Sequence, residues 1–193
     1  MLADGRHDLP PGKLAMVVTY LEARALKLRN VPEPEGVTFT ELPRNRAAYL
    51  DVYARVGADW LWGDVLRLSA DAFDARLQSA DTSLWTLRQD GVNHALLELD
   101  FSRPDRCKLA YFGVSTALIG SGAGAFLMDR AQELAFAQRD LLTVETCTLD
   151  SPQALGFYLR SGFTATRRGV EVVDDPRMTG LMDAALAPEL PKI

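Results

Sequence analysis

Three glycines stand close together where a predicted strand gives way to a predicted helix. Gly120, Gly122 and Gly124 alternate with small residues just ahead of a helical pattern over 122–139. A glycine costs a helix roughly 1 kcal/mol relative to alanine, so helix stability does not account for them. The first N–H groups of a helix lack partners in the helix and carry the positive end of its dipole. Because glycine has no side chain to block the approach of a phosphate, we predict an anion cradle here.

Two common phosphate-binding patterns are not met by these glycines. Their Gly-x-Gly-x-Gly spacing differs from the Gly-x-Gly-x-x-Gly of dinucleotide-binding folds, and no Gly-Lys-Ser/Thr of a P-loop follows. Glu145 nevertheless lies 25 residues after Gly120, near the end of the next predicted strand, where a dinucleotide-binding fold would place an acid. A nucleotide-dependent oxidoreductase therefore stays open as an alternative, and retention of NAD(P) by the purified protein would support it.

A second pattern begins 27 residues after Gly124, where residues 151–163 read Ser-Pro-Gln-Ala-Leu-Gly-Phe-Tyr-Leu-Arg-Ser-Gly-Phe. Together the two stretches resemble the acetyl-CoA-binding half of the GNAT (GCN5-related) N-acetyltransferases. The motifs of that family are Gln/Arg-x-x-Gly-x-Gly/Ala and Asn-x-x-Ala-x-x-Phe-Tyr-x-x-x-Gly-Phe. The resemblance implies an α/β (α+β) fold whose mixed, mostly antiparallel sheet has helices on both faces. It also implies that the sheet splays between the predicted strands 107–114 and 141–149.

The resemblance implies an enzyme that moves an acetyl group from acetyl-CoA to a primary amine of a small molecule or peptide. It implies no metal, and because many relatives are dimers, a homodimer is one assembly to expect. The cofactor-binding positions it implies lie on one strand end, on the glycine stretch and at the start of the second motif. They are Phe112, Val114, Ile119, Gly120, Ser121, Gly122, Ala123, Gly124, Ala125 and Ser151.

Two positions depart from the family motifs. Ile119 stands where the family usually has Gln or Arg, so that side chain's contact with the pyrophosphate is absent. Ser151 replaces the usual Asn, although Asp150 and Ser151 are both suited to cap the following helix. These departures favour a second alternative, a non-catalytic acyl-CoA-binding or sensor module, which predicts coenzyme A binding without turnover.

Two residues are candidates for proton transfer. Tyr158 occupies the place of a tyrosine that, in the family, often protonates the leaving thiolate. An amine attacks a thioester only when it is neutral, so a base is also needed. Period-two alternation puts Leu96, Glu98 and Asp100 on one face of a predicted strand. We expect Glu98 to border the cleft and to take the proton directly or through water. The resemblance further implies an oxyanion site of backbone N–H groups at a bulge near the end of strand 107–114.

Aromatic residues form the predicted acceptor site. Trp60 and Trp62 lie in the connection between the first two predicted helices, a region that often walls the acceptor pocket in the GNAT family. Tyr111 lies on a neighbouring predicted strand. Two tryptophans can hold an apolar or aromatic amine, and they can equally plug the end of the core. The predicted substrate-binding residues are Trp60, Trp62 and Tyr111.

Periodicity and turn residues indicate the elements that position these side chains. After a flexible arm over 1–12, we expect residues 13–193 to form one domain. The apolar residues at 47, 50, 53 and 56 should form the buried face of the first helix. The expected helices span 43–57, 69–80, 122–139 and 151–162. The expected strands span 13–26, 37–42, 106–114, 141–149 and 163–173, with a hairpin over 82–101 that turns at Asp90 and Gly91.

Composition excludes several classes of function. The chain has 193 residues, of which 48% are hydrophobic and 24% charged, and a formal net charge of -5. These values are typical of a soluble globular protein and leave no basic face for nucleic acid. Cys107 and Cys147 fit neither a disulfide framework nor a zinc site. The N-terminal residues show no signal peptide, and no apolar run is long enough to span a membrane, so we expect a cytoplasmic protein.

Overall fold

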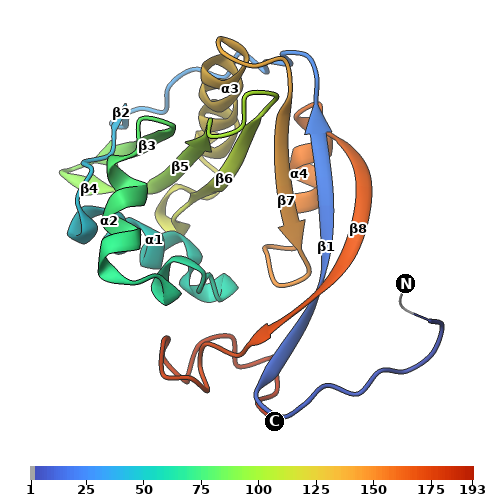
Figure 1. Ribbon diagram of the computed structural model, residues 1–193. Coiled ribbons are helices and arrows are strands. Elements are labelled where there is room, and N and C mark those ends of the chain that lie inside the picture. The colour runs from blue at the N-terminus through green and yellow to red at the C-terminus, as the bar shows by residue number, and fades with distance from the viewer. Residues whose placement is uncertain (1–2) are drawn as a thin grey trace.

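An eight-stranded sheet organises residues 3–193, the part of the chain that the computed structural model describes (Figure 1). Each pairing in the sheet of these residues is antiparallel except the one between β6 and β7. The predicted α+β fold with a mixed, mostly antiparallel sheet is therefore confirmed. The strands run in the order β2 (Thr38–Glu41), β3 (Thr82–Gln89), β5 (Ala95–Asp100), β6 (Cys107–Val114), β7 (Leu142–Cys147), β1 (Lys13–Ala23) and β8 (Thr164–Asp174), and β4 (Val92–Asn93) pairs with β3.

Helices cover both faces of the sheet, as predicted. One face carries α1 and α2 over β3, β5 and β6, and the other carries α3 and α4. Asn45 and Ser69 cap α1 and α2, because each side chain accepts a hydrogen bond from a backbone N–H of the first turn. The helices are α1 (Arg46–Gly57), α2 (Ala70–Gln78), α3 (Ala123–Phe136) and α4 (Ala154–Arg160), and short 3-10 turns span Ala58–Trp60, Val65–Arg67 and Thr116–Leu118.

The buried face of α1 differs from the predicted one. Tyr49, Val52, Tyr53 and Val56 are buried, whereas Ala47 is exposed and Leu50 is only half-buried. The two tyrosine rings stack on each other with centroids 5.8 Å apart, so aromatic packing selects the face. Tyr53 and Val56 of the predicted face are therefore confirmed, and Tyr49 and Val52 take the places predicted for Ala47 and Leu50, which rotates the face by about a quarter of a turn.

The first strand of the chain takes the sixth place in the sheet. β1 pairs antiparallel with β7 on one side and with β8 on the other, so β7 and β8 do not pair with each other (Figure 1). The sequence predicted this strand but not its position. Its partners lie more than a hundred residues away in the chain, and pairing over that distance leaves no local pattern.

The parallel pair at the centre of the sheet separates soon after it begins. Residues 107–109 lie opposite residues 142–144, and beyond them β6 and β7 diverge (Figure 1). The register against β5 shifts between Glu98 and Leu99, which leaves Ala110 as an extra residue on β6. The predicted splay is confirmed, but the bulge lies in the middle of β6 rather than near its end.

Candidate active site

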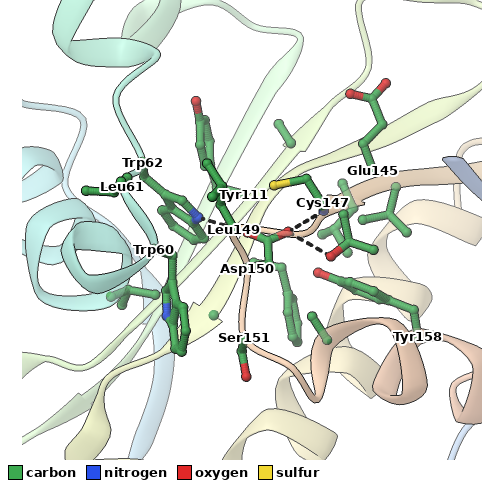
Figure 2. Close-up of a pocket in the computed structure, with 18 of the residues that line it drawn as sticks. Trp60, Leu61, Trp62, Tyr111, Glu145, Cys147, Leu149, Asp150, Ser151 and Tyr158 are labelled. Atoms are coloured by element: carbon green, nitrogen blue, oxygen red, sulfur yellow. Dashed lines mark hydrogen bonds between the residues drawn. The ribbon is translucent and has the colours of Figure 1, made fainter. Parts of the chain in front are cut away.

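A cavity of about 1030 Å³ opens where β6 and β7 diverge. It is large enough for a ligand of cofactor size. The glycine stretch and α4 border it, as do the connection after α1 and residues of β1 (Figure 2). The structure therefore brings together the predicted cofactor-binding and substrate-binding residues that line this cavity, among them Trp60, Trp62, Tyr111, Phe112, Val114, Ile119, Gly120, Gly122, Gly124, Ala125, Ser151 and Tyr158.

Glycine is required at these three positions for different structural reasons. Gly120 and Gly122 have φ angles of +85° and +87°, a left-handed conformation that favours glycine. Gly124 lies in the first turn of α3, where an added Cβ would meet only the Phe157 ring at 4.0 Å. Among the hydrogen bonds of residues 3–193, none uses the backbone N–H of Gly122 or Gly124. Two glycines thus shape the loop, and the third leaves the helix N-terminus open toward the cavity.

The edge of β6 that faces the opening also carries free backbone groups. The Ser115 N–H donates to the His94 carbonyl at 2.7 Å, which marks a hydrogen-bonded pair between β6 and β5. Such pairs alternate along an antiparallel ladder, so Phe112 and Val114 direct their N–H and C=O groups away from β5. That direction is the side from which β7 has departed. The predicted backbone positions therefore face the cavity.

Tyr158 extends from α4 into the cavity (Figure 2). Its ring is 7% exposed and packs edge-on against Phe112, Phe157 and Phe163. Burial, together with the charge of Asp150, raises the pKa of the Tyr158 phenol above its ordinary value of 10.0. The phenol therefore keeps its proton at neutral pH.

Glu98 does not lie where the sequence placed it. Its carboxylate is 1% exposed, and among residues 3–193 it is not part of the cavity lining. Tyr49 donates a hydrogen bond to Glu98 at 2.5 Å, and the Arg76 guanidinium pairs with it at 2.5 Å. Desolvation raises the pKa of Glu98, although Arg76 and Tyr49 act in the opposite direction. The expectation that Glu98 borders the cleft is wrong, because helices α1 and α2 cover that face of β5.

Arg76, which the sequence analysis missed, connects Glu98 with the cavity. Its guanidinium lies 5.4 Å from the centre of the Tyr111 ring, and both side chains line the cavity. Such a cation–π contact fixes the ring against its neighbours. Glu98 is therefore connected to the cavity lining through Arg76, which contacts Tyr111.

The Tyr49–Glu98 hydrogen bond should matter for stability. Tyr49→Phe removes the hydroxyl that donates to the buried carboxylate, and we expect a loss of about 1–3 kcal/mol in the free energy of unfolding. Urea denaturation at neutral pH measures it. Tyr53→Phe is the matched control on the same helix, since the buried Tyr53 hydroxyl has no hydrogen-bond partner in the described chain. Equal losses in both variants would mean that the hydrogen bond to Glu98 adds no specific stability.

Trp62 is held in a close-fitting niche. A Cβ added at Gly57 would come within 2.2 Å of its ring, and one added at Gly113 within 3.6 Å. Leu61 has a φ of 55°, a left-handed conformation that is rare outside glycine and turns the chain between the two tryptophans. Trp60 and Trp62 both line the cavity, and Trp62 also packs on the core beneath α1. Trp62 thus packs against the core and also presents part of its surface to the cavity.

Asp150 is the second residue that the sequence analysis misjudged. One of its oxygens accepts hydrogen bonds from the Thr146 hydroxyl at 2.7 Å and the Cys147 N–H at 2.9 Å. The predicted helix cap is therefore wrong, since α4 has Gln153 at its N-cap and no side-chain capping bond. Ser151 comes closer to the predicted role, since its hydroxyl donates to the Gln153 side chain at 2.6 Å and accepts a long hydrogen bond, 3.4 Å, from the Gln153 N–H directly before α4. An acid directly after a strand end, before the second motif, is the signal that could have identified Asp150.

Other kinds of site receive no support from the residues described. No group of three or more His, Cys, Asp or Glu side chains within residues 3–193 is arranged to hold a metal ion. In the same part of the chain, no helix combines the length and apolar character required to span a membrane.

Comparisons with solved structures support the fold. A GCN5-related N-acetyltransferase from Sphaerobacter thermophilus is 15% identical, with a TM-score of 0.62 over 83% of this chain and 52% of that chain. One from Kribbella flavida is 17% identical, with a TM-score of 0.50 over 88% and 63%. A tandem GNAT protein from the clavulanic acid biosynthesis pathway is 14% identical, with a TM-score of 0.56 over 82% and 53%. The chain thus spans between half and two thirds of the length of these structures.

A family model identifies the greater part of the chain. The model of the acetyltransferase (GNAT) domain matches residues 51–176, from within α1 to just beyond β8. A search of curated proteins finds no match. The matched region contains the glycine stretch, the diverging strands β6 and β7, and α4, whereas β1 lies outside it. This match covers more than half of the sequence, and the chain belongs to the GNAT family of acetyltransferases.

Proposed function

We propose that the protein is an N-acetyltransferase that moves an acetyl group from acetyl-CoA to a primary amine of a small molecule or peptide. The observation that carries this proposal is a single cavity with two sets of free backbone N–H groups. One set belongs to Gly122 and Gly124 at the start of α3, and the other to Phe112 and Val114 on the open edge of β6. The first suits a pyrophosphate and the second suits the amides of a pantetheine arm.

The residues present fit coenzyme A in most respects. The N-terminus of α3 is open because Gly124 lacks a Cβ. The edge of β6 that faces β7 has no strand partner in the described chain beyond Leu109, where the two strands diverge. The donor would supply the activated acetyl group as a thioester. The chain's own part is to bind its phosphates and amides, to place donors near the carbonyl oxygen and to supply a proton to the thiolate. The sheet also differs from the doubly wound parallel sheet of dinucleotide-binding folds, which weighs against the oxidoreductase alternative.

Ile119 offers a test of the phosphate site by gain of affinity. Its side chain is 66% exposed and lines the cavity immediately before Gly120. In Ile119→Arg a cation would stand beside the proposed pyrophosphate, and we expect coenzyme A to bind about 3- to 10-fold more tightly at low salt. Calorimetric titration at two ionic strengths measures the gain, which should shrink as salt rises. Ile119→Gln is the uncharged control, and equal affinity in all three proteins would place the pyrophosphate elsewhere.

We assign two roles in the reaction to side chains of the cavity. Tyr158 bears a proton at neutral pH and is the acid for the departing thiolate. Trp60, Trp62 and Tyr111 form the wall of the acceptor site. Glu98 lies outside the cavity lining among residues 3–193 and supports that wall through Arg76 rather than acting as the base.

The decisive experiment is a screen of primary amines that follows release of the coenzyme A thiol from acetyl-CoA. We expect coenzyme A to bind and at least one class of amine to accelerate thiol release. Binding of coenzyme A without turnover on any amine would favour the sensor module instead. Retention of NAD(P) with no affinity for coenzyme A would favour the oxidoreductase and overturn the proposal.

A further inference from the structure

Asp150 lines the cavity, and its two oxygens lie in different environments. Oδ2 accepts both the Thr146 and Cys147 hydrogen bonds, at 2.7 and 2.9 Å, and so fixes the end of β7. Oδ1 has only a long contact, 3.5 Å, from the indole N–H of Trp62. Figure 2 shows this carboxylate between the two tryptophans on one side and Tyr158 on the other. One oxygen is therefore structural, and the other is left for a ligand.

This carboxylate has no positive partner of its own. Among the ion pairs of residues 3–193 none includes Asp150, and the same is true of Asp100 and Glu171, whereas the other two acids of the cavity lining each have one. Asp64 lies 3.8 Å from Arg67, and Glu145 lies 3.1 Å from Lys108. All three hydrogen bonds recorded for Asp150 are accepted by its oxygens, and a half-buried acid without a counter-ion favours a bound cation.

The surroundings of Asp150 restrict the shape of that cation. Trp60, Trp62, Leu61 and Leu149 line the same part of the cavity (Figure 2). The Trp62 ring lies 5.3 Å from the Tyr111 ring at an angle of 53°, so the two form a corner rather than a flat wall. Aromatic faces attract cations and bury apolar surface at the same time. A compact ammonium group on an apolar or aromatic skeleton matches both features.

We propose that Asp150 docks the ammonium group of the acceptor, and that the acceptor is a primary amine carried on an apolar or aromatic skeleton. This inference rests on the proposed acetyl transfer. The docking point and Tyr158 line the same cavity, and Tyr158 lies on the side of Asp150 away from the tryptophans (Figure 2). An amine held there lies near the Tyr158 phenol, which donates a proton to the coenzyme A thiolate. Asp150 is the carboxylate in contact with the ammonium group, and it accepts the proton that the amine must lose before it attacks the thioester.

Two small probes of the same shape test the docking site. 2-Phenylethylamine carries an ammonium at neutral pH, and 2-phenylethanol replaces it with a neutral hydroxyl. We expect the wild-type protein to bind the amine at least tenfold more tightly than the alcohol, measured by calorimetry with and without coenzyme A. Asp150→Asn should weaken amine binding to the level of the alcohol and leave alcohol binding unchanged. The asparagine keeps an oxygen for Thr146 and the Cys147 N–H, so the fold should persist.

Two further variants distinguish a specific effect of Asp150 from the loss of any negative charge or of apolar surface in the cavity. Asp64→Asn removes another negative charge from the cavity lining and should leave the preference for the amine within twofold. Trp60→Leu should weaken both probes alike. Equal weakening of amine and alcohol in Asp150→Asn, no preference in the wild type, or an equal loss in Asp64→Asn would each overturn the inference. Coenzyme A binding without this preference would overturn the docking site alone, whereas the preference without coenzyme A binding would overturn only the acetyl transfer.

Discussion

Gly124→Val should abolish coenzyme A binding and leave the protein folded. The new Cβ would point into the cavity, where the nearest atom is a Phe157 ring carbon at 4.0 Å, so the folded chain accommodates the side chain. Valine is also no worse than glycine in a helix. The branched side chain, however, occupies the approach to the free N–H groups at the start of α3. We expect affinity to fall by about 100-fold or more, which is roughly 2.7 kcal/mol, in a calorimetric titration.

Gly156→Val is the matched control for this prediction. Gly156 also lies in a helix, α4, but it does not belong to the cavity lining among residues 3–193. Its added Cβ would meet only the mobile end of Arg160, at 3.0 Å. Gly122 is less informative, because its φ of +87° means that any side chain there strains the backbone as well as filling the cradle. Unchanged affinity in a folded Gly124→Val protein would make the third glycine a packing residue.

Local signals were enough to predict much of the site. The glycine stretch and the second motif are short, and each lies on one helix start that its own residues specify. Alternation along β5 correctly separated Leu97 and Leu99 from Leu96, which pack on opposite faces of the sheet. These features depend on neighbours within a few residues, which a sequence displays directly.

Features that depend on distant segments were missed. Glu98 is buried because Tyr49 of α1 and Arg76 of α2 fold onto it, and neither helix is adjacent to β5 in the chain. The place of β1 between β7 and β8 arises from the same kind of long-range pairing. Asp150 was misjudged because its position relative to α4 fits a helix cap, whereas the turn after β7 draws its carboxylate backward. In each case tertiary contacts override the local preference.

Tyr158→Phe should lower kcat by roughly 10²- to 10⁴-fold, the usual contribution of a general acid. Coenzyme A affinity and stability should not change, because no hydrogen bond among residues 3–193 uses the Tyr158 hydroxyl. The ring, which packs against Phe112 and Phe157, is retained in the variant. The measurement is thiol release with an amine from the screen, in single turnover, so that slow product release does not hide the loss.

The pH dependence of kcat is a second measurement of the role of Tyr158 as an acid. A raised pKa means that the Tyr158 phenol holds its proton to higher pH than an ordinary tyrosine does. An acid must be protonated to act, so its contribution is fully present at neutral pH and declines only above the ordinary value of 10.0. The wild-type kcat should therefore show no alkaline decline from Tyr158 between pH 7 and that value.

Tyr20→Phe is the control for removing a tyrosine hydroxyl outside the cavity. Tyr20 lies on β1, where the Arg167 guanidinium stacks on its ring, and it does not line the cavity among residues 3–193. Its variant should keep the wild-type rate. If Tyr158→Phe also kept that rate in single turnover, the thiolate would take its proton from water, and Tyr158 would only pack against Phe112 and Phe157. The raised pKa of its phenol would then be a consequence of burial beside Asp150, without a part in the reaction.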